Sequence, residues 1–177
     1  MHPFELTQPV SAVDHVQGPE HARVTVVEYG DFECPNCKQA APSVKLLMQR
    51  FPERVRFVFR HFPLVEVHPH AQLAAEAAET AGAQGKFWPM HDLLFEHQLH
   101  LKDSQLRGYA GQLQLDMTRY AAEMDDHVYL QRVREHQQSG RDSGARGTPT
   151  FFVNGRLQDV SFGLQGLFGA VEAVLKR

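Results

Sequence analysis

Two cysteines stand three positions apart in the segment Cys34-Pro35-Asn36-Cys37, and they are the only cysteines among the 177 residues. Such a pair can form a disulfide within one helical turn, or it can supply two of the four ligands of a zinc site. As a redox pair, it would carry out thiol-disulfide exchange, in which a thiolate attacks a disulfide sulfur. No other thiol competes with these two.

The residues around the pair predict that it opens a helix. Residues 23–29 form an apolar segment typical of a buried strand, and Gly30 ends it. Helix-forming sequence begins just beyond Cys34. Pro35 suits the first helical position because the N–H that it lacks would have no partner there. We therefore expect Cys34 at the N-cap and Cys37 inside the first turn.

This location predicts which sulfur reacts. The unpaired N–H groups and the positive end of the helix dipole should stabilise a thiolate at Cys34, whereas Cys37 should be less accessible. Asn36 can donate a hydrogen bond but brings no charge, and the carboxylates of Asp31 and Glu33 would oppose the thiolate if they lay close. Cys34 is thus the expected nucleophile and Cys37 the resolving thiol.

Zinc binding is the main alternative chemistry, because the chain has eleven histidines. A zinc site would need two of them beside the cysteines, yet no C-x₂-C…H-x₃₋₅-H spacing follows the pair. We therefore expect no metal site and interpret most histidines as surface or packing residues. The histidines that lie near one another in the sequence are His68 and His70, and then His91, His97 and His100.

A second informative segment lies far downstream and predicts a β-hairpin. Residues 150–153 read as a strand, Asn154-Gly155 suits a type I′ turn, and residues 156–160 return. Thr148-Pro149 stands directly before the first strand. An ordinary trans proline that starts a strand is the simplest interpretation of this dipeptide taken alone.

The cysteine pair and the Thr-Pro hairpin together resemble the thioredoxin superfamily. The order of elements resembles its DsbA-like members: strand, helix, a second strand at residues 55–60, a long helical stretch, the hairpin and a last helix. The resemblance covers about residues 20–177. Segments that look like those of bacterial DsbA-family proteins are residues 28–34, 60–64, 84–88 and 147–152.

The resemblance implies an α/β fold of the thioredoxin type. It implies one domain over residues 1–177, with a helical insertion at residues 62–145 between the second strand and the hairpin. It also implies that Thr148-Pro149 is a cis-proline loop, packed against the cysteines, that binds substrate. Pro35 and Asn36 would then tune the active-site pair.

Glu28 ends the apolar strand six residues before Cys34. A carboxylate at a strand end is usually exposed. In DsbA-like enzymes, however, a buried acid at the matching position assists proton transfer to and from the resolving thiol. The resemblance therefore makes Glu28 a third candidate catalytic residue, and burial would raise its pKa toward the working range.

Apolar residues at helical spacing predict the helices of the insertion and the last helix. Pro42 should kink the active-site helix without ending it, because the apolar pattern continues beyond it. Asp116 is a candidate N-cap for the fourth helix of the insertion. The predicted helical ranges are 69–82, 86–100, 106–113, 116–124, 127–140 and 163–176.

Composition indicates a globular domain and excludes some partners. With 42% hydrophobic and 22% charged residues the chain can bury a core, and a net charge of −3 offers no basic surface for nucleic acid. We expect no membrane-spanning segment and find no signal-peptide pattern. A natural start at Met1 would indicate the cytoplasm, and a removed signal would indicate the periplasm.

The sequence thus predicts a thiol-disulfide oxidoreductase that exchanges disulfides with protein or small-thiol substrates through Cys34 and Cys37. No cofactor is expected, and a separate redox partner would recycle the pair. A thioredoxin-like reductase or isomerase is the first alternative. A redox-sensing or zinc-binding module without enzyme activity is the second. Substrates, direction and oligomeric state stay open.

Overall fold

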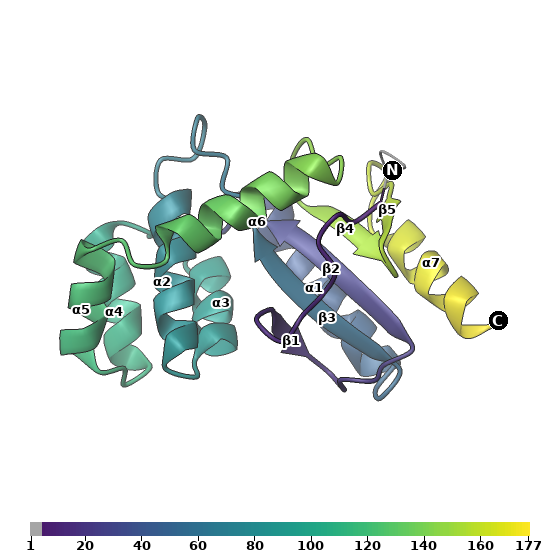
Figure 1. Cartoon of the computed structure of the whole chain (residues 1–177), viewed down its shortest axis with the longest axis horizontal. Coiled ribbons are helices and arrows are strands. Elements are labelled where there is room, and N and C mark those ends of the chain that lie inside the picture. Colours follow the sequence, from purple (N-terminus) through teal and green to yellow (C-terminus); the bar gives the residue numbers. More distant parts are fainter. Residues whose placement is uncertain (1–4) are drawn as a thin grey trace.

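A five-stranded sheet forms the centre of the computed structural model, which describes residues 5–177 (Figure 1). Strands β2 and β3 run parallel in the middle, and the other neighbours pair antiparallel. The order across the sheet is β1-β3-β2-β4-β5. The strands are β1 (His15–Gln17), β2 (Val24–Gly30), β3 (Val55–His61), β4 (Thr150–Val153) and β5 (Arg156–Gln158).

Helix α1 (Pro35–Arg50) connects the two parallel strands, as a parallel pair requires. It contains Pro42 and continues for two more turns, so the helix does not end at this proline, as predicted. Its buried side chains include Val44 and Leu47. These pack in one apolar cluster with Val24 and Val26 of β2, so α1 covers one face of the sheet.

Alternation along β2 sends neighbouring side chains to opposite faces. Val27 and Tyr29 belong to a second, smaller cluster with Phe152 of β4, on the other face from Val26. Both faces of the central strands are therefore buried. This explains why the sequence shows a nearly continuous apolar run there.

Five helices lie between β3 and β4. Four of them form a group beside the sheet, and α6 runs from this group back across one end of the sheet (Figure 1). Asp116 caps α5 as predicted, because its side chain accepts a hydrogen bond from the Arg119 N–H. The helices are α2 (Ala71–Ala83), α3 (Phe87–Glu96), α4 (Asp103–Gln112), α5 (Met117–Asp125), α6 (Leu130–Asp142) and, after β5, α7 (Gln165–Leu175).

Some boundaries differ from the predicted ones. The helix predicted over residues 86–100 ends at Glu96, and the one predicted from residue 127 begins at Leu130, because His127 has a φ of 50° that a helix cannot contain. The short strand β1 was not predicted. The Asn154-Gly155 turn is confirmed, since both residues have the positive φ that a type I′ turn needs (46° and 82°).

No helix within residues 5–177 has both the length and the apolar character needed to cross a membrane. This finding concerns the described part of the chain alone.

Candidate active site

The cysteine pair lies where β2 gives way to α1. Cys34 is the N-cap, with extended backbone angles (φ −73°, ψ 120°), and Pro35 occupies the start of the helix. The Cys34 N–H donates a hydrogen bond of 3.1 Å to the Asp31 carbonyl. Both thiols are free, and Cys34 keeps 4% of its surface exposed whereas Cys37 is fully buried. The pair therefore has an outer and an inner sulfur, as the sequence predicted.

The pKa values of the two thiols are shifted in opposite directions. A hydrogen bond from the Cys37 thiol is the largest cause that lowers the pKa of Cys34, which falls to about 5. The backbone N–H groups of Cys37 and Asn36 lower this pKa further, against the effect of burial. Burial, followed by the hydrogen bond to Cys34, raises the pKa of Cys37 well above its ordinary value. At neutral pH the outer sulfur is a thiolate and the inner one a thiol.

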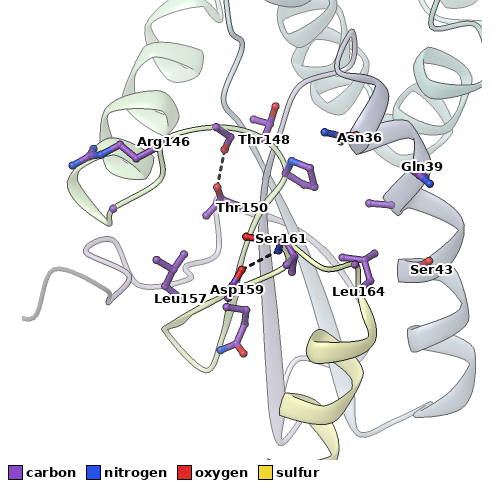
Figure 2. Close-up of a pocket in the computed structure, with 17 residues that line it drawn as sticks. Asn36, Gln39, Ser43, Arg146, Thr148, Thr150, Leu157, Asp159, Ser161 and Leu164 are labelled. Carbon is purple, nitrogen blue, oxygen red and sulfur yellow. Dashed lines mark hydrogen bonds between the residues drawn. The ribbon is translucent and has the colours of Figure 1, made fainter.

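The loop before β4 lies directly against the outer sulfur. The Thr148–Pro149 peptide is cis, and the Cys34 sulfur lies 3.4 Å from the Thr148 carbonyl oxygen, to which its protonated form donates a hydrogen bond. The Thr150 hydroxyl donates to the Gly147 carbonyl at 2.7 Å and so tightens the turn (Figure 2). The structure therefore brings Cys34, Thr148 and Pro149 together from segments more than one hundred residues apart.

A groove of about 990 Å³ adjoins this loop. Figure 2 shows the first turns of α1 at the right of the groove, Leu164 before α7 close to them, and Arg146 and Leu157 at the left, beyond the loop of Thr148. Asn36 belongs to its wall, so the groove reaches the cysteine motif. Polar side chains in the lining include Asn36, Gln39, Ser43, Gln158, Asp159 and Ser161.

Glu28 lies behind the cysteines and is buried, so the interpretation of an exposed strand-end carboxylate is wrong. Only 3% of it is exposed, and its Oε1 atom has no hydrogen-bond partner. Burial and, secondly, the Cys34 charge raise the pKa of Glu28 to about 8. A side chain at Gly30 would meet the Phe59 ring at 2.5 Å, so this glycine lets the ring approach the strand beside Glu28.

The carboxylates of Asp31 and Glu33 form hydrogen bonds with the segment between β3 and α2. The Asp31 carboxylate accepts hydrogen bonds from the Leu64 N–H at 2.9 Å and from His68 Nδ1 at 2.7 Å. The Glu33 carboxylate accepts one from the His70 N–H at 2.7 Å. The sequence singled out these acids as possible opponents of the thiolate. The structure instead uses them to attach a loop to the active-site turn.

Within the described residues, no three His, Cys, Asp or Glu side chains are placed to hold a metal ion. His91 illustrates what the histidines do instead. It is buried in α3, and its ring packs against Phe59 and Phe95 with centroids 4.9 and 5.0 Å apart.

Comparison with known families defines the class of protein. A family model described as Thioredoxin matches residues 11–173, nearly the whole chain. The chain therefore belongs to the thioredoxin family. The fold is of the DsbA-like type, as predicted from the order of elements.

Two solved structures are close in shape. BdbD from Bacillus subtilis, crystallised in its oxidised form, superposes with a TM-score of 0.83 at 25% identity, covering 98% of this chain and 99% of that one. A thioredoxin-like oxidoreductase from Silicibacter pomeroyi gives a TM-score of 0.82 at 26% identity, covering 94% and 95% of the two chains. These likenesses include the helices between β3 and β4.

Several curated relatives are named as sodium/proton antiporters and are much longer than this chain. A Salinispora arenicola protein named Na(+)/H(+) antiporter NhaA 1 is 52% identical over 158 residues, which make up 89% of this chain but 24% of that protein. The chain spans about a quarter of the length of such relatives. The similarity thus concerns one segment of a larger protein.

The acidity of Cys34 gives a direct prediction. We expect alkylation of the reduced protein by iodoacetamide to be half-maximal near pH 5, because the thiolate is the reacting form and the pKa of Cys34 is lowered to about 5. Cys37 should stay unmodified, since its pKa is raised and its sulfur is buried. Mass spectrometry of peptides along a pH series measures both. A midpoint near the ordinary thiol value, or earlier labelling of Cys37, would contradict this assignment.

Proposed function

We propose that the protein is a DsbA-like thiol-disulfide oxidoreductase. The observation that carries this proposal is the acidic Cys34 at the start of α1, in contact with both a buried partner thiol and the cis-proline loop. A helix N-terminus that stabilises one thiolate of a close pair supports disulfide exchange. Zinc coordination would instead need further ligands near the pair, and none is present among residues 5–177.

In the proposed reaction a substrate thiolate attacks Cys34 of the oxidised pair. The bond between the two cysteine sulfurs breaks as the bond to the substrate sulfur forms, and Cys37 leaves with the electron pair and takes up a proton. A second substrate thiolate then attacks the substrate sulfur of the mixed disulfide, and Cys34 leaves as a thiolate. The substrate loses two electrons and gains a disulfide, and the enzyme is left reduced. A disulfide-bearing partner must reoxidise it.

The acidity of Cys34 supports oxidation of substrates rather than their reduction. At pH 7 a thiol with a pKa of about 5 favours the reduced enzyme by about 100-fold over an ordinary thiol, which corresponds to about 60 mV. Because the pKa is lowered, this contribution is present at and above neutral pH and disappears as the pH falls through 5. An enzyme whose reduced form is stabilised gives its disulfide away readily.

The test is the reduction potential against glutathione, combined with turnover. We expect a potential clearly above the value of about −270 mV of thioredoxin, and faster formation than reduction of disulfides in a protein substrate. A potential at or below that of thioredoxin, with rapid reduction of protein disulfides, would favour the reductase alternative. Absence of exchange in either direction would favour a redox sensor and overturn the proposal.

The groove beside the cis-proline loop supports extended polypeptides as substrates. Backbone groups at Thr148 could pair with such a segment next to Cys34, in the manner of an added β-strand. We propose that residues 1–177 act as one unit, with residues 62–145 as its helical insertion. An oxidant of this kind would work in a compartment without a reducing thiol pool, such as the periplasm.

The antiporter-named relatives suggest a second proposal, supported by the 52% identity to a segment of one of them. We infer that those proteins join a thiol-disulfide module to another part, and that ion exchange belongs to the other part. The purified 177-residue chain should then exchange disulfides but move no sodium in proteoliposomes. Sodium-dependent proton movement by this chain alone would contradict the inference.

A further inference from the structure

Gln98 contacts the active-site turn from a distant part of the chain. It lies in the turn after α3, and 8% of its surface is exposed. Its Nε2 donates hydrogen bonds to two main-chain carbonyls, those of Phe32 and Cys34, and each is 2.8 Å long. A buried side-chain amide that spans two carbonyls on either side of one residue fixes the path of the backbone there.

The turn that carries Gln98 is itself held firmly. The His97 N–H donates to the Leu93 carbonyl at 2.9 Å, and the His100 N–H donates to the His97 carbonyl at 2.8 Å. From α4, the Tyr109 hydroxyl donates to the His100 carbonyl at 2.6 Å, and its ring stacks on that of His97. The backbone that carries the Gln98 amide is therefore fixed by hydrogen bonds within its turn and by a contact with α4.

The Cys34 carbonyl accepts more than the Gln98 bond. The N–H groups of Cys37 and Lys38 also point to it, at 3.1 and 3.2 Å. The Cys37 N–H is at the same time one of the donors that lower the pKa of the Cys34 thiol. Sulfur and carbonyl oxygen of one residue thus share a single N–H. When Gln98 also donates to the Cys34 carbonyl oxygen, that oxygen attracts the Cys37 N–H less strongly, and the N–H remains available to the Cys34 sulfur.

We propose that Gln98 is a positioning residue, which holds the Cys34 carbonyl so that the N–H groups of the first helical turn remain directed at the Cys34 sulfur. The helical layer would in this way set the reactivity of the nucleophile without touching substrate. An effect of Gln98 on the rate of disulfide exchange rests on the proposed function, whereas its effect on the acidity of the Cys34 thiol does not.

The test compares Gln98→Met with Gln84→Met. Methionine keeps the unbranched shape and loses both donors. Gln84 is a matched control, because its side chain also makes two backbone hydrogen bonds, both to Asp116, at 2.7 and 3.2 Å and far along the chain from the cysteines. We expect Gln98→Met to move the alkylation midpoint of Cys34 upward by about one pH unit, or tenfold in thiolate at acidic pH. Gln84→Met should leave the midpoint unchanged.

A second variant keeps the test decisive if Gln98→Met fails to fold. Gln98→Asn retains the amide but is one methylene shorter, so it cannot span both carbonyls, and its midpoint should rise by less than that of Gln98→Met. An unchanged midpoint in a folded Gln98 variant, or an equal shift in Gln84→Met, would overturn the proposal. Because alkylation needs no substrate, this result is independent of whether the wild-type protein exchanges disulfides.

Discussion

Cys34→Ser is expected to abolish disulfide exchange, whereas Cys37→Ser is expected to stop turnover while accumulating mixed disulfides. The first variant removes the sulfur whose pKa is lowered to about 5 and which contacts the cis-proline loop. The second leaves that sulfur free to attack a substrate disulfide, and it removes Cys37, whose attack on Cys34 would release the substrate from the mixed disulfide. Activity should fall by several orders of magnitude in both, so the variants are distinguished by the trapped species.

Non-reducing electrophoresis and intact-mass measurement detect the trapped adducts. The double variant is the control, since it should form none. Adducts that form on Cys34→Ser through Cys37, or turnover that survives in Cys34→Ser, would reverse the roles of the two cysteines. The fully buried position of Cys37 is the structural reason to expect neither result.

Much of the site could be predicted because its signals are local. An N-cap followed by proline, and a cysteine one turn further, are sufficient to locate the start of α1 and to orient both sulfurs relative to it. The Asn154-Gly155 turn and the Asp116 cap are equally local, and both agree with the structure. The pairing of Thr148-Pro149 with the cysteines is not local. It followed only from the resemblance to a known family.

What escaped prediction depends on contacts between distant segments. Gln98 is 66 residues from Phe32, and His68 is 37 from Asp31, so no spacing rule connects either pair. Strand β1 is only three residues long and is defined by its pairing with β3, which leaves no periodic pattern to read. Burial of Glu28 depends on surrounding side chains such as Phe59, contributed by another strand, so it could be expected only from the resemblance and not from the residues around it in the sequence.

Glu28→Gln is expected to stabilise the reduced protein while slowing exchange. An ordinary glutamate is ionised at pH 7, whereas the pKa of Glu28 is raised to about 8 in the folded protein. Ionisation therefore favours the unfolded chain as the pH rises above the ordinary value of 4.5, and this effect is complete above pH 8. At pH 7 the cost is about 3 kcal/mol, which glutamine would avoid. Denaturant unfolding at pH 4 and pH 7 should show the gain at the higher pH alone.

The kinetic effect follows from the protonated state of the same carboxyl group. Cys37 leaves as a thiolate into a buried site that strongly disfavours its charge, so a neutral Glu28 beside it can supply the proton. Loss of this donor should slow attack on the oxidised enzyme by about 100-fold. Corrected for the ionisation of the substrate thiol, the wild-type rate should fall at alkaline pH, where the buried Glu28 loses its proton, and the rate of Glu28→Gln should not. Equal rates and parallel pH profiles would show that Glu28 takes no part in proton transfer. If Glu28→Gln gained stability without losing rate, Glu28 would be a buried carboxyl group that lowers the stability of the protein and takes no part in exchange.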